Sequence, residues 1–306
     1  MMTRAFTASR RSASTLILSL WALLLLSAVI LAWAKWIDQR LEQSHEANLA
    51  LEARALAFSG LMVGLHPSVT PRTPALEATP EPERSYKVTI RGEGGKLNLA
   101  YLLLGENPER IGILRDYLTL RGLDLEEQQA LLDGLLDWVD PDNVRRMHGK
   151  EEDATYKPAN KAITSLEELP LVEGSAPLLA KYPEWRNDFT LMSQGPLDLK
   201  SAPKELIALI PGIGDLRAEQ FVKMRQGPDG EDETEDDPVF DSIDQVITAL
   251  MMTREQFEAI RSLVSYDDPT VRIVSRGQAG EVHRQVEVVA RRVEGNPPQM
   301  LMWIEN

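Results

Sequence analysis

A long uncharged run near the amino terminus sets the first limit on what this chain can fold into. Residues 12–34 contain no Asp, Glu, Lys or Arg and are rich in Leu and Ala. A helix of about 20 such residues spans a hydrocarbon core about 30 Å thick. Arg4, Arg10 and Arg11 precede the run without any acidic residue, which predicts a cytoplasmic amino terminus and an exported body. The segment therefore predicts a single-pass membrane helix.

The helical pattern continues past this apolar run. Apolar side chains recur three, four or eight positions apart at Ile37, Leu41, Leu49, Ala53 and Leu56. This spacing is typical of an amphipathic helix, and no proline interrupts it before Pro67. Residues 14–66 are therefore predicted to form one rod. Its stretch from residue 15 to residue 58 alone would measure about 66 Å at 1.5 Å per residue.

The residues are compatible with three fates for this segment. Ala32, Trp33 and Ala34 have the small-x-small form of a signal-peptidase site, so a secreted protein could begin at Lys35. An uncleaved simple anchor is the second alternative. Retention of the whole rod is the third, and we favour it because a cleaved signal would gain nothing from a helix that continues beyond the cut.

The rest of the chain divides into β and α parts. Residues 67–84 contain five prolines and no apolar period, which predicts an exposed linker. Residues 85–104 alternate apolar and polar residues, turn at the glycines of 92–95 and then resume, which predicts a β-hairpin. Residues 269–306 return to a period of two and predict the closing strands.

The intervening residues 105–268 have helical periodicity. Ile111, Leu114 and Leu118 share one face of a predicted helix, and Asp124 is placed to cap the next one. Two β parts far apart in sequence thus enclose a helical insertion, and we expect their strands to complete one sheet. The predicted fold class is α+β, with a long amino-terminal helix, a small antiparallel sheet and a large all-α insertion.

One element within the insertion has the outline of a DNA-binding helix-hairpin-helix. Two short helices are predicted within residues 200–225, around the turn Pro211, Gly212, Ile213 and Gly214. The glycines could present backbone N–H groups to a phosphate. Charge argues against that role, because residues 228–244 hold nine acidic residues and no Lys or Arg, and the chain has a formal charge of −14. We therefore expect no nucleic-acid partner, with a membrane-anchored DNA-binding protein as an alternative.

Acidic side chains also gather after the second predicted helix: Asp137, Asp140, Asp142, Glu151, Glu152 and Asp153. Asp140 and Asp142 alternate in a proline-containing turn, as oxygen ligands of a hard cation such as calcium often do. These six residues are the candidate ligands of a metal site. A solvated acidic loop is the alternative interpretation.

Catalytic motifs are absent from the sequence. The four histidines are scattered, cysteine does not occur, and neither H-E-x-x-H nor G-x-S-x-G is present. We therefore predict no catalytic residues and no enzyme activity. An exported hydrolase with a cleaved signal peptide is the alternative.

The amino terminus resembles that of type IV pilins and type II secretion pseudopilins, in which a basic leader precedes an apolar and then amphipathic helix. In that family a prepilin peptidase cuts after a small residue and the new amino terminus is methylated. The resemblance implies a leader of residues 1–13 and a cut between Ala13 and Ser14, with alanine in place of the usual glycine. Leu18 then takes the fifth mature position, where most pilins carry glutamate. The general secretion pathway protein K family characteristically lacks that glutamate.

The order of elements and several phrases also resemble the protein K family, among them "LLDGLLDWVDPDN", "ITSLEELPLVEG" and "LDLKSAPKELIALIPGIG". The resemblance implies a structural minor pseudopilin at the pseudopilus tip, in the bacterial inner membrane with its body in the periplasm. Its implied partners are other minor pseudopilins, the major pseudopilin, the prepilin peptidase and the inner-membrane assembly platform. It also implies calcium in the helical insertion, after the phrase Asp137 to Asp140.

Overall fold

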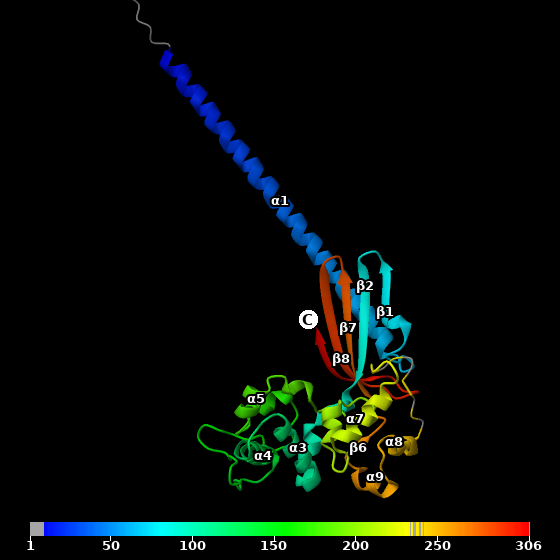
Figure 1. Ribbon diagram of the computed structural model, residues 1–306. Helices are drawn as coiled ribbons and strands as arrows, with labels where there is room; N and C mark the ends of the chain where they lie inside the picture. The colour runs from blue at the N-terminus through cyan, green and yellow to red at the C-terminus, as the bar shows by residue number, and fades with distance from the viewer. Residues whose placement is uncertain (1–8, 233, 235–236, 239, 241, 306) are drawn as a thin grey trace, which may run out of the picture.

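The computed structural model describes residues 9–232, 234, 237, 238, 240 and 242–305, with the side chains of residues 9–15 outside the described part. A single long helix leads from the amino terminus to a small sheet, and the helical insertion lies at the far end of that sheet (Figure 1). This layout confirms the predicted α+β fold class.

Helix α1 (Ser9–Leu65) is continuous over 57 residues, which confirms the predicted rod. Within the stretch Leu16–Leu65, an 18-residue window reaches a mean hydropathy of 2.5 and none of it is buried in protein. The last part of α1 differs, because Ala53, Ala57 and Leu61 have no exposed surface. The helix therefore stands free in its apolar half and packs on the body in its amphipathic half.

The described residues form one five-stranded antiparallel sheet in the order β1-β2-β7-β8-β9. Its strands are β1 (Glu77–Glu81), β2 (Arg84–Gly92), β7 (Thr270–Ala279), β8 (Val282–Arg291) and β9 (Gln299–Glu305). Strands β2 and β7 pair without a break from Arg84↔Ala279 to Gly92↔Val271. Because this pairing joins segments about 180 residues apart, the prediction that distant strands complete one sheet is correct.

Two predictions about the segment before the insertion are wrong. Residues 67–84 are not only a linker, because they contain the short helix η1 (Pro74–Leu76) and the edge strand β1. Residues 85–104 do not form a hairpin, because the chain after β2 enters η2 (Glu93–Gly95), a two-residue strand β3 (Leu97–Asn98) and helix α2 (Leu99–Leu103). The antiparallel partners of β2 are β1 and β7 instead.

Helix α1 lies unusually close to the sheet. A Cβ atom added to Gly277 would stand 2.0 Å from the carbonyl oxygen of Ala53 and 2.4 Å from the nitrogen of Ala57. On the helix, a Cβ at Gly60 or Gly64 would meet side chains of β2 and β7 at 2.5–3.0 Å. Arg292 follows β8 and donates to the carbonyls of Gly64 (2.9 Å), His66 (3.3 Å) and Val69 (2.9 Å), which closes the helix end.

The insertion has a hydrophobic core of its own, separate from the one between α1 and the sheet. Its helices are α2, α3 (Pro108–Leu120), α4 (Leu125–Val139), α5 (Ala176–Lys181), α6 (Lys204–Ala208), α7 (Gly214–Arg225), α8 (Ile243–Ala249) and α9 (Arg254–Ile260). Two short parallel pairs, β3 with β4 (Phe189–Thr190) and β5 (Leu197–Asp198) with β6 (Val264–Ser265), tie them together. Asp124 caps α4 and forms a capping box with Glu127, as the sequence predicts.

A buried ion pair joins the insertion to the sheet. Glu93, in the segment that enters the insertion, is 1% exposed and accepts hydrogen bonds from Arg272 of β7 at 2.7 and 2.8 Å. The Thr190 hydroxyl of β4 donates to the same carboxylate at 2.7 Å. One side chain therefore connects the sheet, the entrance of the insertion and its interior.

Candidate functional site

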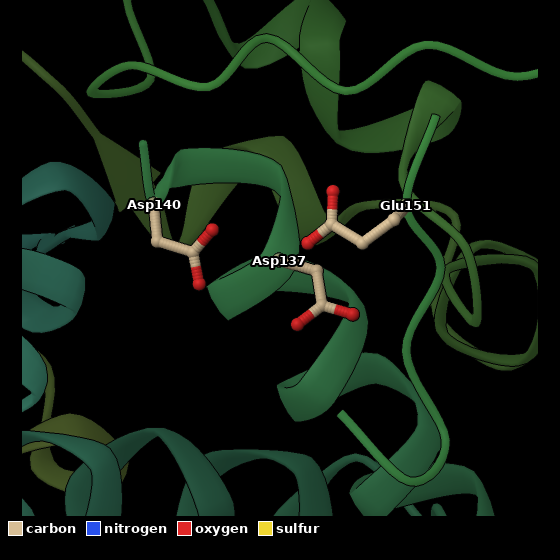
Figure 2. Close-up of side chains that lie close together, drawn as sticks. All are labelled: Asp137, Asp140 and Glu151. Atoms are coloured by element: carbon tan, nitrogen blue, oxygen red, sulfur yellow. The ribbon is translucent and has the colours of Figure 1, made fainter. Parts of the chain in front are cut away.

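Three of the predicted acidic ligands meet at the end of helix α4. Asp137, Asp140 and Glu151 each offer a carboxylate oxygen, and these oxygens lie within 4.8 Å of one another (Figure 2). Asp137 and Asp140 are one helical turn apart in the sequence, and Glu151 comes from the loop that follows. Asp137 has no exposed surface, and the other two are half-buried. We call these three residues the carboxylate cluster.

Arg146 lies against this cluster, and the sequence analysis missed it. Its guanidinium donates to Asp137 at 2.6 Å and to Asp140, and it also pairs with Glu106 at 2.7 Å. Burial lowers the pKa of Arg146, but the hydrogen bonds that its guanidinium donates to Asp140, Asp137 and Glu106 outweigh burial and raise the pKa above its usual value. Arg146 therefore stays charged and neutralises part of the cluster.

Several oxygens of the cluster have no hydrogen-bond partner among the described residues. These atoms are Oδ1 of Asp140 and both carboxylate oxygens of Glu151, and all three are buried. Burial is the main cause that raises the pKa of Glu151, followed by the charges of Asp137, Asp140 and Asp142. Buried oxygens that lack donors, beside an excess of negative charge, are the environment that a hard cation such as calcium would satisfy.

The other three predicted ligands lie outside the cluster. Asp142 accepts from the backbone N–H of Val144 at 2.8 Å. Glu152 is exposed and pairs with Lys157 at 3.3 Å. Asp153 accepts from Thr155 and Tyr156, and these hydrogen bonds lower its pKa to about 2. The structure therefore brings together half of the predicted set. Of the other half, Asp142 and Asp153 stabilise loop turns and Glu152 forms a surface ion pair.

Gly149 is a second residue of this site that the sequence analysis missed. A Cβ atom at this position would stand 2.0 Å from Oδ2 of Asp137, so only glycine lets the loop pass this close to the carboxylate. The run Arg-Met-His-Gly before Lys150 carries no local signal of such an approach. The contact depends on the path of the loop and not on a motif.

The predicted helix-hairpin-helix is present as α6 and α7 around the turn Pro211 to Gly214. Gly212 and Gly214 have positive φ angles of 79° and 69°, which favour glycine. Phe221 and Ala218 are fully buried, so they belong to the core and leave no stacking surface for bases. The backbone therefore has two short helices joined by a glycine-containing turn.

Most of the basic side chains of this element already have hydrogen-bond or ion-pair partners within the protein. Arg225 is buried, where it donates to the carbonyls of Leu199 and Ala202 and pairs with Asp232 at 2.9 Å. Arg217 bonds back to the carbonyl of Gly212, and Lys223 pairs with Glu219 at 2.8 Å. Three of the five predicted cations, Lys200, Lys204 and Arg217, have no ion pair among the described residues, and Arg217 is held by the carbonyl alone. This arrangement weighs against phosphate binding.

The predicted processing site lies at the edge of the described part of the chain. The backbone of Ala13 and Ser14 belongs to helix α1, and their side chains lie outside the described residues. The cut between them therefore stays a prediction.

Comparisons with known proteins agree with this architecture. Residues 95–182 match the family model described as "Type II secretion system (T2SS), protein K", first domain. This span covers the cluster, the entrance of the insertion and helices α2 to α5. No curated protein matches the chain.

A solved structure also has the same fold. A chain in the crystal structure of the GspK-GspI-GspJ complex, from the type II secretion system of enterotoxigenic Escherichia coli, aligns with a TM-score of 0.58. The alignment covers 87% of this chain and 99% of that one, at 17% sequence identity. The similarity therefore extends over most of this chain and nearly all of that one.

Proposed function

We infer that this chain is a GspK-type minor pseudopilin of a type II secretion system, because a protein K domain lies at residues 95–182 and the fold matches over 87% of the chain. These findings confirm the family predicted from the sequence. Helix α1 is compatible with a single-pass membrane anchor of such a component. The protein is thus a structural part of the secretion machinery.

We further propose that the protein occupies the tip of the pseudopilus, with its body in the periplasm. The observation that carries this proposal is the place of the insertion, which lies at the end of the sheet away from the free part of α1 (Figure 1). In a helical filament, subunits stack along their long helices. A bulky domain above the stalk would prevent another subunit from stacking on top, so the terminal position is the one that such a shape allows.

The exposed side of α1 supplies the surface for assembly. Leu41 and Leu51 are exposed beyond the apolar segment, and Met62 is exposed where the helix packs on the sheet. The GspK of the solved complex is found with GspI and GspJ. We propose that counterparts of those two proteins pack against α1 here, and that the major pseudopilin, prepilin peptidase and assembly platform are further partners. No step of this function needs catalysis by this chain.

Amino-terminal sequencing of the protein from its membrane tests the proposal. We expect Ser14, methylated, as the first residue. The matched variants Ala13→Leu and Ala34→Leu separate the two cleavage routes, since each places a large side chain before one cut. Ala13→Leu should leave the leader attached, and Ala34→Leu should have no effect. A mature chain that begins at Lys35 would remove the stalk and overturn the proposal.

We also propose that the carboxylate cluster binds calcium. The support is the donor set, with one fully buried carboxylate, two half-buried ones and three buried oxygens without a donor. Asp137, Asp140 and Glu151 would hold the ion, and Arg146 now compensates part of their charge. A bound cation would supply the remaining positive charge and fix the loop after α4 against the helix.

Calorimetry with calcium on the full chain in detergent tests this site. The variant Glu151→Gln should weaken binding about tenfold or more, because it removes a charged ligand. The control Glu152→Gln changes a neighbouring carboxylate outside the cluster and should bind like the unmodified protein. With a chelator present, Glu151→Gln should raise Tm, because the folded state disfavours the charged form of Glu151. Equal affinities for the two variants, or no heat at all, would rule the site out.

A further inference from the structure

The two faces of the five-stranded sheet have different surroundings. Residues of one parity, such as Val88, Ile273 and Val288, are buried against helix α1. Residues of the other parity point to the opposite side, which we call the open face. On β2 and β7 the open face carries exposed side chains at Lys87 and Arg276. It is therefore the side of the sheet that α1 leaves uncovered.

On the open face, basic residues lie directly opposite one another, which is unfavourable for the stability of the sheet. Lys87 and Arg276 are directly opposite each other across β2 and β7, and Arg91 is directly opposite Arg272. Like charges in this position destabilise a sheet. Arg291, at the end of β8 opposite Thr270, adds a further cation that is half-buried, with its Nε buried and without a hydrogen-bond partner among the described residues. We call Lys87, Arg91, Arg276 and Arg291 the basic face.

Little in the described chain neutralises the basic face. Arg272 is excluded from it because Glu93 and Glu287 hold its guanidinium. Lys87 pairs with Glu77, but the two side chains are 68% and 66% exposed, so the pair contributes little. Arg276 donates to the neutral amide oxygen of Gln285 at 2.8 Å. Within the described residues, Arg91, Arg276 and Arg291 have no ion pair, although the chain as a whole is acidic.

We propose that the basic face is a docking surface for a partner protein that presents an acidic segment. Charge complementarity is the argument, because carboxylates at the rungs of Lys87 and Arg91, about 13 Å apart along the strand, would relieve the repulsion between the cations. Val274 and Ile304 lie on the rung between them and offer apolar contact, on either side of Glu287, whose charge is paired with Arg272. Such a mixture of cations and apolar side chains is typical of a protein interface.

Two other anionic partners fit the surface less well. The turn between β7 and β8 lies beside Leu49, and the helix rises about 21 Å between Lys35 and Leu49, which is more than a screening length of about 8–10 Å. A membrane surface is therefore too distant to hold the basic face. The described open-face positions of β2, β7 and β8 carry no Phe, Tyr or Trp on which nucleic-acid bases could stack. The proposal adds a second surface to the protein and does not depend on the position at the tip.

The test uses the full chain in detergent and a labelled poly-L-glutamate peptide of about 20 residues as the probe, followed by fluorescence anisotropy at low and physiological salt. The variant Arg276→Glu should weaken binding about fivefold or more, because it reverses a central charge. The same variant should raise Tm, because it converts the Lys87–Arg276 repulsion into an attraction. If the basic face serves binding at the expense of stability, the variant should show weaker peptide binding and a higher Tm together.

The control variant Lys223→Glu makes the same change of charge on helix α7 and should leave the affinity for the peptide unchanged. If Arg276→Glu does not fold, Arg276→Gln should still weaken binding. Equal loss in the control would mean that only overall charge matters and would overturn the proposal. Absence of peptide binding, or tighter binding to a 20-base-pair DNA duplex or to vesicles with anionic lipid, would overturn it as well. None of these outcomes bears on the processing at Ser14 that tests the proposed function.

Discussion

Replacing Gly277 by alanine is expected to lower the free energy of unfolding of the helix-sheet unit by about 3 kcal/mol. The added Cβ would stand 2.0 Å from the Ala53 carbonyl oxygen and 2.4 Å from the Ala57 nitrogen, both of which are backbone atoms of α1. Backbone atoms cannot move out of the way by changing a rotamer. The whole helix must therefore shift from the sheet, which opens the packing around Ala57 and Leu61.

Urea titration of the full chain in detergent measures this loss. The insertion has its own core, so we expect two transitions in the variant, with the helix-sheet unit melting first. The control is Gly112→Ala on helix α3, where an added Cβ meets nothing within 4 Å and alanine is the better helix former. If Gly277→Ala unfolds at the same denaturant concentration as this control, the close approach of helix and sheet does not hold the unit together.

The regular helices could be predicted from the sequence because their signals are local. The continuity of α1 follows from apolar spacing without proline, and the start of α4 follows from Asp124 and the acids behind it. The closing strands β7 and β8 also follow from their period of two, but the role of Gly277 within β7 does not. This position is glycine because helix α1 passes there, and the sequence of the strand alone carries no sign of that helix.

The predicted hairpin was wrong for a related reason. The glycines of residues 92–95 suggested a turn, but a Cβ at Gly95 would stand 2.5 Å from the Ser201 carbonyl oxygen. These glycines therefore let the chain pass close to a segment about 100 residues away. Leu97 and Leu99 continued the alternation by coincidence, because both belong to the core of the insertion. A period of two over so few residues cannot separate a strand from an irregular buried segment.

The carboxylate cluster shows the same limit. Asp137 and Asp140 could be placed together because they are one helical turn apart. Glu151 joins them through a loop whose path depends on Gly149 and on Arg146, and neither role is visible in the sequence. Asp142 was predicted as a ligand because it alternates with Asp140 in a turn, and Glu152 and Asp153 were predicted because they are near in sequence. Instead, Asp142 and Asp153 accept hydrogen bonds from backbone N–H groups in turns, and Glu152 pairs with a surface lysine.

The largest single-residue effect outside the glycines is expected at Glu93, where alanine should cost about 3–5 kcal/mol of stability. The carboxylate is 1% exposed and accepts from Arg272 and Thr190. Without it, the Arg272 guanidinium keeps Glu287 as its one carboxylate partner among the described residues, and the Thr190 hydroxyl loses its acceptor. Because this contact joins the sheet to the insertion, the variant should also loosen the angle between them, which small-angle scattering would detect.

Two comparisons make this result specific to a buried ion pair. The control Glu305→Ala removes the exposed pair with Arg54 and should cost no more than about 1 kcal/mol. The double variant Glu93→Leu with Arg272→Met should recover part of the loss, because it removes both buried charges and keeps the volume, while Glu287 loses its partner. A Glu93→Ala variant no less stable than Glu305→Ala would contradict the assigned role.

The pH dependence of the same variant provides an independent check. Burial alone would raise the pKa of Glu93, but the hydrogen bond from Arg272 and the charges of Lys96 and Arg272 lower it below the usual value. A carboxyl group whose pKa is lower in the folded state stabilises the fold above its unfolded pKa, about 4.3, and loses that contribution as the pH falls through its folded pKa. The stability gap between the unmodified protein and Glu93→Ala should therefore be full at pH 7 and narrow below about pH 4. A gap that stays constant down to pH 3 would mean that lost packing, and not the charge of Glu93, causes the destabilisation.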